Sequence, residues 1–223
     1  MSDGLAVVSP HLDDAVLGCG ERLVANPGAV VVTVFAGRPA VTTPLPAWDA
    51  AAGFREGDDV VGARRREDAA ALGLLRATPV WLDFLDAQYA PPPALTTVTA
   101  TLDAVLAAIA PATVLIPLGL FHSDHALVHE AALACARRGG DRRWVVYEEP
   151  MYRRVPDARS RRFATLQAAG VALEPEPEPP TRARALKRRA MFCYRSQLRA
   201  LARPGGPGWR DALEPERYWR LCV

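Results

Sequence analysis

The sequence has little of what marks membrane, secreted or dinucleotide-binding proteins. No apolar run reaches the roughly 20 residues of a membrane helix, and the N-terminal segment lacks the basic and apolar regions of a signal peptide. The four cysteines are widely spaced and form no C-x-x-C pair, which favours reduced buried thiols over disulfides or a zinc knuckle. No G-x-G-x-x-G follows the first predicted strand. A cytoplasmic protein without a membrane span is expected.

Lysine is nearly absent, and charge is unevenly spread. Lys187 is the one lysine, and the net charge of the 223 residues is only +2. Residues 1–136 carry 7 arginines against 15 acidic residues, whereas residues 137–223 carry 20 basic residues against 10 acidic ones. The favoured interpretation is a solvated basic surface, and the alternative is a basic rim that attracts an anionic substrate or nucleic acid. Because no nucleic-acid motif accompanies the charge, nucleic acid is not expected as a partner.

Strands alternate with helices along the first two thirds of the chain. The hydrophobic pattern predicts strands over 5–8, 29–35, 78–82, 113–116 and 144–147, and helices over 14–25, 63–75, 94–110 and 123–138. This alternation is typical of a parallel sheet covered on both faces. We therefore predict an α/β, Rossmann-like three-layer fold with a mainly parallel sheet. There is no internal repeat and no sign of a second core, so a single domain over 1–223 is expected.

Other stretches lack a clear period. Residues 37–62 are rich in Pro, Gly and Asp and are expected to form a long loop at the same edge as the end of the first strand. Residues 174–180 alternate Glu and Pro, which predicts an extended, hydrated connector. A single helix is predicted over 182–202, and a Gly- and Pro-rich loop over 204–208 precedes the tail.

Chemically active residue types follow the first predicted strand. His11, Asp13 and Asp14 lie in the turn between this strand and the next helix, where α/β folds bind ligands. Imidazole and carboxylate together suit a cation such as Zn²⁺, and a further carboxylate beside the metal is a candidate general base. The alternative is that the two aspartates cap the helix N-terminus. A second cluster is needed to favour the metal.

Residues 122–125, His-Ser-Asp-His, form that second cluster directly after the fourth predicted strand. With His129, all four histidines of the chain therefore lie in two strand-end segments. On a helix, the histidines at 122, 125 and 129 would form one stripe that points off the core. The first and fourth strands of a doubly wound sheet are often neighbours, which would bring this stripe to His11 and Asp14.

Together the two clusters resemble the PIG-L/LmbE-like N-acetylglucosaminyl deacetylases. The resemblance rests on Ser-Pro-His11-Leu-Asp13-Asp14 with a distal His122-x-x-His125, supported by Arg64-x-x-Glu67-Asp68, Asp83-Phe84-Leu85-Asp86, and Lys187 with Tyr194-x-Ser196-Gln197. It covers nearly the whole chain and implies a Rossmann-like fold that holds one Zn²⁺. It also implies that the C-terminal part, about 149–223, completes the fold and the substrate cleft.

By this resemblance, His11, Asp14 and His125 are the metal ligands, Asp13 is the general base, and His122 assists the tetrahedral intermediate or the leaving amine. Three protein ligands and one open position are what a catalytic zinc needs, whereas structural zinc is usually closed by four ligands. Successive side chains point in different directions, so Asp13 and Asp14 are not expected to bind the same metal ion. One of them is therefore expected to be a ligand and the other a free base.

Other residues of the motifs keep two interpretations. Arg64 could hold substrate oxygens through paired hydrogen bonds, or it could be an exposed helix cation paired with Asp68. Asp86 could accept hydrogen bonds from sugar hydroxyls, or it could form a turn. His129 matches no ligand position and is expected on the helix surface. Ala15 departs from the family pattern, which has Glu there.

The expected function is that of a zinc-dependent hydrolase that removes an acyl group, acetyl in the first instance, from the amide nitrogen of an amino sugar or related metabolite. An amidase acting on a larger amide, such as a thiol conjugate, is one alternative. A non-catalytic Rossmann-like binding module is the other. The expected partner is a small N-acylated molecule. A basic rim would be compatible with an anionic substrate, and the sequence is also compatible with an oligomeric protein.

Overall fold

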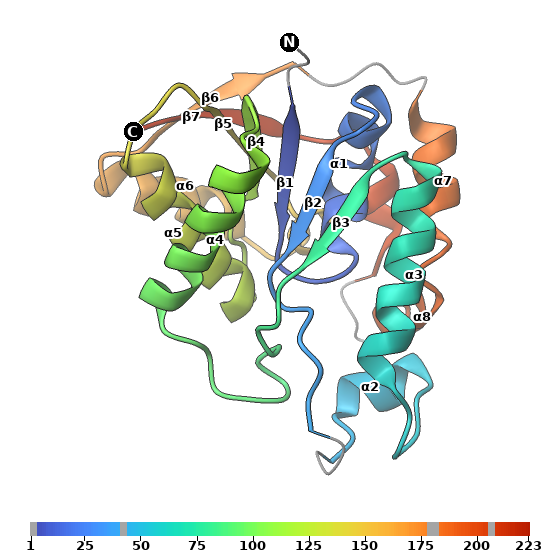
Figure 1. Cartoon of the computed structure of the whole chain (residues 1–223). Coiled ribbons are helices and arrows are strands. Elements are labelled where there is room, and N and C mark those ends of the chain that lie inside the picture. Colours follow the sequence, from blue (N-terminus) through green and yellow to red (C-terminus); the bar gives the residue numbers. More distant parts are fainter. Residues whose placement is uncertain (1–3, 41–43, 178–182, 205–207) are drawn as a thin grey trace.

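The computed structural model describes residues 4–40, 44–177, 183–204 and 208–223. One seven-stranded sheet of order β3-β2-β1-β4-β5-β7-β6 forms its centre (Figure 1). The strands are β1 (Leu5–Ser9), β2 (Val30–Thr33), β3 (Thr78–Trp81), β4 (Thr113–Pro117), β5 (Arg143–Tyr147), β6 (Ala172–Glu176) and β7 (Tyr218–Cys222). Strands β1 to β5 are parallel, and β7 runs antiparallel to both of its neighbours. The predicted single α/β domain with a mainly parallel sheet is confirmed.

Helices cover both faces of the sheet, which gives the predicted three layers (Figure 1). One face carries α4 (Leu95–Ile109), α5 (Ser123–Arg137) and α6 (Ala158–Ala168), and the other carries α1 (Asp14–Ala25), α3 (Val60–Leu74), α7 (Arg184–Met191) and α8 (Arg195–Leu201). Shorter elements are α2 (Ala47–Ala52) and the 3-10 turns η1 (Pro150–Tyr152) and η3 (Arg210–Leu213).

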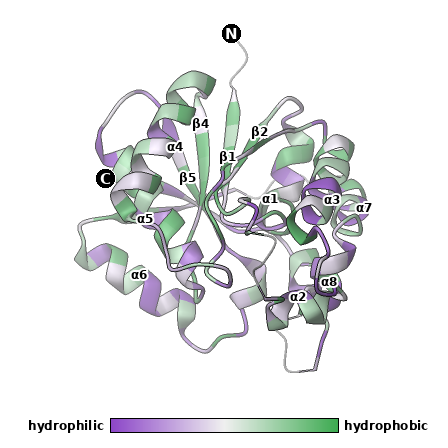
Figure 2. Cartoon of the chain, turned by 60° about the horizontal axis from the view of Figure 1, so that its bottom comes forward, coloured by the Kyte–Doolittle hydropathy of each residue, from purple (hydrophilic) through white to green (hydrophobic). Residues whose placement is uncertain are grey.

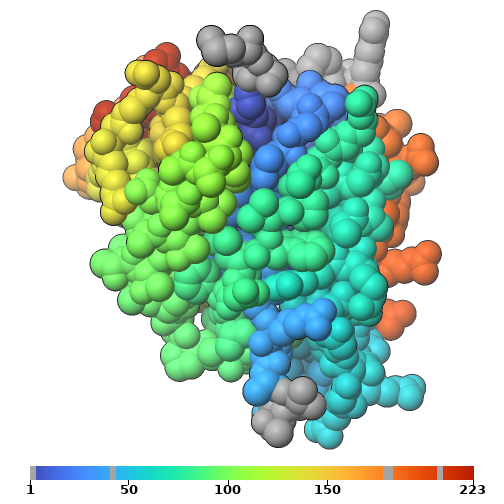
Figure 3. All heavy atoms as spheres, viewed as in Figure 1, coloured from blue at the N-terminus to red at the C-terminus, as the bar shows by residue number. Residues whose placement is uncertain are grey.

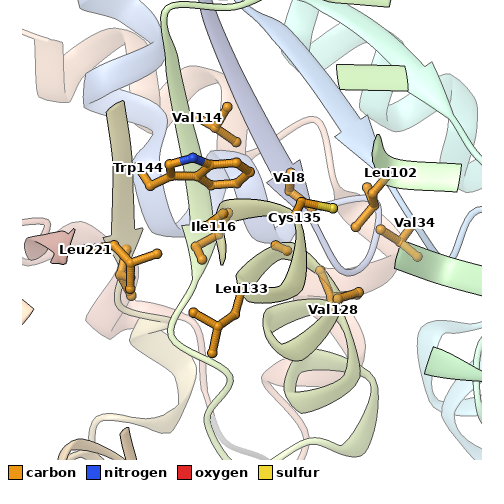
Figure 4. Packing of buried hydrophobic residues seen from close by; sticks show 14 of the residues in the cluster. Val8, Val34, Leu102, Val114, Ile116, Val128, Leu133, Cys135, Trp144 and Leu221 are labelled. Carbon is orange, nitrogen blue, oxygen red and sulfur yellow. The ribbon is translucent and has the colours of Figure 1, made fainter. Parts of the chain in front are cut away.

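The central strands β1, β2, β4 and β5 supply alternate side chains to two separate cores. Val8 and Ile116 point toward α4 and α5, where Trp144 and Leu102 join them (Figure 4). Residues on the opposite face of the same strands, such as Val7, pack against α1 and α3. Because a strand buried on both faces needs apolar residues at every position, these segments are continuous hydrophobic runs. Figure 2 shows the result as green colouring along much of β1 and β4.

The segment over 37–62 is more ordered than predicted. It contains helix α2, and α3 begins at Val60 rather than at 63. The Asp59 side chain caps α3 by accepting a hydrogen bond from the Gly62 N–H. Asp59 is a typical N-cap residue, but it was not recognised as one because residues 37–62 were predicted to form a loop. Residues 41–43 lie outside the described part of the chain.

The C-terminal third differs most from expectation. The helix predicted over 182–202 is two helices, α7 and α8, separated at residues 192–194. The expected connector over 174–180 is in part the edge strand β6, with residues 178–180 outside the described chain, as are 205–207 of the predicted loop. An edge strand tolerates Pro175 because one side of its backbone needs no partner. Strand β7 was not predicted at all.

Much of the basic charge of this third is solvent-exposed, in agreement with the favoured interpretation. Arg188 and Arg189 on α7, and Arg195 and Arg199 on α8, are exposed. Orange side chains of this region project from the right-hand edge in Figure 3. Among the described residues, no helix is both long and apolar enough to cross a membrane.

Candidate active site

The topology brings the two predicted histidine segments together. β1 and β4 are hydrogen-bonded neighbours, and the chain leaves β1 toward β2 on one side while β4 continues to β5 on the other. This is the switch point at which open α/β sheets bind ligands outside the carboxyl ends of their strands. The turn after β1 carries His11 and Asp14, and the turn and helix after β4 carry His122 and His125. These ends point downward in Figure 1.

Three donor atoms from these turns form a nearly equilateral triangle. Nδ1 of His11 lies 3.2 Å from Oδ2 of Asp14. Nε2 of His125 lies 3.2 Å from the same oxygen and 3.3 Å from Nδ1 of His11. Zinc bonds of about 2.0–2.1 Å in a tetrahedron place neighbouring ligand atoms about 3.3 Å apart. The three side chains therefore fit one zinc-sized cation and leave a fourth position open.

A buried carboxylate stands behind each of the two histidines. Nδ1 of His125 lies 3.2 Å from Oε1 of Glu149, which also accepts hydrogen bonds from the Gly119 and Leu120 N–H groups. Nε2 of His11 lies 3.1 Å from Oδ2 of Asp124. Such outer carboxylates fix the tautomer and orientation of metal-binding histidines.

Sequence reasoning assigned no role to either carboxylate. Asp124 lies inside the second cluster. Glu149 follows the fifth strand at the same edge of the sheet, and this position could have indicated that it belongs to the site. His11, His122 and Asp124 also bring donor atoms within 4.8 Å of one another. Because Nε2 of His11 already lies 3.1 Å from Oδ2 of Asp124, we assign Asp124 to orienting His11.

The charges of this cluster stabilise one another. Burial alone would raise the pKa of Asp14, but His125 and His11 outweigh it and hold the pKa well below its usual range. Burial would likewise lower the pKa of His125, yet Asp14 and Glu149 raise it to about 9. A cation between these groups would take the place of the protons that the histidines otherwise hold.

Asp13 lies beside the triangle without belonging to it. It precedes α1 but makes no capping hydrogen bond, so the capping alternative is wrong for this residue. Ser9 accepts the Ala15 N–H instead, at 3.0 Å. Burial, together with the negative charge of Asp14, raises the pKa of Asp13 to about 7. Its side chain lines the cavity in front of the histidines.

His122 is the N-cap of α5 rather than part of its stripe. Its Nδ1 accepts a hydrogen bond from the Asp124 N–H at 3.2 Å, which leaves Nε2 to carry the proton of the neutral ring. Burial, reinforced by His11 and His125, lowers its pKa. The ring is thus a neutral N–H donor at the cavity wall.

A cavity of about 390 Å³ opens in front of these groups. Its polar wall includes Asp86 and Gln88 from the segment after β3. Its other walls come from remote parts of the chain and include Trp48, Phe121, Met151, Tyr152, Gln197, Leu201 and Arg203. Of these seven residues, sequence reasoning named only Gln197, as part of a supporting motif, although it expected the 37–62 segment and the C-terminal third to border the site.

The remaining predicted residues are placed as follows. Arg64 is 5% exposed and donates to Asp49 at 2.6 Å, so an exposed pair with Asp68 is wrong. It does not line the cavity, but it lines a separate small pocket on the other side of His11 and Asp86. Asp86 forms the predicted turn by accepting the Gln88 N–H, and it also lines the cavity, so a contact with substrate stays a prediction.

His129 is fully buried, and the expectation of a surface histidine is wrong. It donates from Nδ1 to the Pro117 carbonyl oxygen at 2.7 Å. The helix turns this ring under the sheet edge, away from the cavity that His122 and His125 line. Burial disfavours the protonated, positively charged form of this ring and lowers the pKa of His129 to about 4.

Glu149→Gln is expected to weaken zinc binding by about 10- to 100-fold, the usual effect of losing an outer carboxylate. The amide keeps the size of the side chain but removes the charge that favours the His125 tautomer needed for binding. Competition with a chromogenic chelator measures the affinity. Glu148→Gln is the matched control, because the Glu148 carboxylate contacts Arg153, Arg159 and Arg217 instead. Equal zinc affinity in Glu149→Gln and the wild type would exclude this role.

Fold and site together define an α/β protein with a His–Asp group that could hold a metal ion at the switch point of its sheet. Residues 6–136 match the family model described as PIG-L, GlcNAc-PI de-N-acetylase. The chain therefore belongs to the PIG-L family. The resemblance seen in the sequence is confirmed, and so is the enzyme class, an amide hydrolase that acts as an N-deacetylase.

Solved structures of deacetylases resemble the whole chain. The A40926 pseudoaglycone deacetylase Dbv21 is 27% identical, with a TM-score of 0.79 over 100% of this chain and 98% of that one. A triple mutant of the teicoplanin-pathway deacetylase, Orf2*T, is 25% identical, with a TM-score of 0.76 over 98% and 97%. The N,N'-diacetylchitobiose deacetylase of Pyrococcus horikoshii shares the fold at 19% identity, with a TM-score of 0.57 over 87% and 70%. A search of curated protein sequences finds no match.

Proposed function

We propose that this protein is a zinc-dependent hydrolase that removes an acetyl group from the amide nitrogen of an amino sugar or an amino-sugar conjugate. The observation that carries the proposal is the triangle of donor atoms on His11, Asp14 and His125, with edges of 3.2–3.3 Å. A free carboxylate and a neutral imidazole flank it in one cavity. Glycopeptide and chitobiose deacetylases among the structural neighbours support this substrate class.

The residues divide the work between binding the cation and moving protons. His11, Asp14 and His125 would hold zinc, which supplies a Lewis acid that makes water nucleophilic at neutral pH. Asp13 accepts the proton of the attacking water, because it is the cavity carboxylate directly next to the ligand Asp14, and it neither caps the helix nor joins the triangle. His122 donates a hydrogen bond from its Nε2–H to the developing oxyanion. Asp13 then passes the proton that it took from water to the leaving amine.

The cavity walls suggest how substrate is held. Asp86 faces the cavity and offers a carboxylate oxygen to sugar hydroxyls. Arg64 is hydrogen-bonded to Asp49, so we propose that it contacts substrate only through the separate small pocket beside His11. Tyr152, Gln197 and other residues of about 149–223 line the cavity, which supports a single functional unit over 1–223 whose C-terminal part completes the cleft. A cytoplasmic location belongs to the same proposal.

Removal of metal is expected to abolish turnover. The purified protein is dialysed against a strong chelator, and acetate release is measured from methyl N-acetyl-β-D-glucosaminide before and after one equivalent of Zn²⁺ is restored. The rate should fall at least ~100-fold and recover with zinc, since a Lewis acid contributes several kcal/mol at the transition state. A binding module would release no acetate in either state. An unchanged rate in the metal-free protein would contradict zinc dependence.

A further inference from the structure

Phe121 is an unusual residue at the edge of the cavity. Its side chain is 76% exposed, more than any other large apolar side chain in the described ranges. It directly precedes His122 and lines the same cavity as the three triangle residues. Burial in the core therefore does not explain why an aromatic residue stands here.

The backbone at Phe121 is strained as well. Its φ is +58°, a left-handed conformation that bulky residues rarely adopt. The His122 N–H donates to the Leu120 carbonyl two residues earlier, at 2.6 Å, which closes a γ-turn around Phe121. Glycine or asparagine would fit this turn with less strain. Strain of this kind persists where it presents a functional group, and here the group presented is an apolar ring.

Phe121 continues an aromatic surface that begins at the metal site. Its ring lies 5.4 Å from that of Tyr152, tilted by 36°. Tyr152 in turn packs edge-on against His125, with ring centroids 5.3 Å apart. We call Phe121 and Tyr152 the aromatic platform. It runs from a proposed metal ligand to the solvent-exposed rim, and Met151 extends the apolar wall beside it.

We propose that the aromatic platform is a substrate subsite for a flat, apolar group attached to the N-acyl amino sugar. The inference rests on the proposed function and specifies its substrate class. A ring stacked on Phe121 would cover exposed apolar surface and gain the offset stacking that aromatic pairs prefer. The same chemistry could come from an aromatic aglycone on the sugar or from an aromatic acyl group on its nitrogen, so the test contains an arm for each.

The test compares paired substrates. The aglycone arm uses phenyl and methyl N-acetyl-β-D-glucosaminides, and the acyl arm uses N-phenylacetyl and N-acetyl methyl glucosaminides, all with the zinc-loaded enzyme. The variant is Phe121→Asn, because asparagine accepts the left-handed backbone and folding should survive. In one arm, the wild type should prefer the aromatic member, and Phe121→Asn should lower the ratio of the two kcat/KM values about tenfold, the upper end of what aromatic stacking contributes.

Phe192→Leu is the matched control. Phe192 is also an exposed aromatic, at 45%, but it packs against Trp209 and does not line the cavity, so the ratio should not change. No aromatic preference in either arm, or a preference that persists in Phe121→Asn, would overturn the subsite. Calorimetry with the same four compounds separates this failure from failure of the proposed function. If no substrate is hydrolysed, tighter binding of the aromatic member of one pair that Phe121→Asn abolishes still supports the platform, and equal binding within both pairs overturns it.

Discussion

Asp13→Asn is expected to keep its zinc and to lose turnover by a factor of at least ~100, the lower end of what a positioned general base contributes. Asparagine preserves the size of the side chain and removes only the proton acceptor. Because Asp13 stands outside the donor triangle, the affinity for zinc should stay near the wild-type value. Zinc per chain and the rate of acetate release are measured on the same preparation.

Asp14→Asn is the matched comparison, one residue along the chain. Its Oδ2 is 3.2 Å from a nitrogen of both His11 and His125, and a neutral amide is a poorer zinc ligand than a carboxylate. This variant should lose metal first and activity as a consequence. The reverse pattern, with zinc lost in Asp13→Asn and kept in Asp14→Asn, would exchange the two roles. A wild-type rate in zinc-loaded Asp13→Asn would transfer the role of base to another group, and His122 is the next to test.

His125→Ala is expected to lose nearly all bound zinc while the sheet and helices remain. The ring is 1% exposed and supplies one corner of the donor triangle, so alanine leaves only two ligands. Zinc bound only by the native state stabilises it by about 2.7 kcal/mol at a hundredfold excess over the dissociation constant. Added zinc should therefore raise the melting temperature of the wild type and leave that of His125→Ala unchanged.

His129→Asn controls for the loss of a buried histidine from the same helix. His129 lies one turn beyond His125 and bonds only the Pro117 carbonyl oxygen among the described residues, a bond that an asparagine amide can replace. This variant should keep one zinc per chain and the thermal shift. Zinc retained at full occupancy in His125→Ala would remove His125 from the proposed ligands.

The local pattern of the sequence was sufficient for the first two thirds of the fold. Parallel strands buried on both faces need continuous runs of apolar residues, and amphipathic helices need a stripe of them, so each element is encoded within its own residues. That is why β1 to β5 lie close to their predicted ranges. Strand β7 was missed because its place between β5 and β6 depends on partners more than 40 residues away. Nothing within Tyr218–Cys222 specifies that pairing.

The proposed metal ligands and base were named from the sequence because imidazole and carboxylate side chains gather at two strand ends, and because the motifs there resemble those of a known family. What surrounds them was decided by packing. Glu149 faces His125 only because β5 lies beside β4 in the sheet. Arg64 meets Asp49 rather than Asp68 only because α2 folds back toward α8 and α3.

The chemistry of the reaction could likewise be predicted from the sequence, whereas the recognition of its substrate could not. A short motif can hold a metal because its donor atoms lie within one turn of chain, or at strand ends that the sheet makes adjacent. A binding wall is assembled from side chains such as Trp48, Tyr152 and Gln197, which are remote in sequence and have no spacing in common. The sequence by itself therefore determined the type of chemistry, whereas the tertiary structure decided the shape of the cleft, because the relative positions of these side chains depend on how every layer packs.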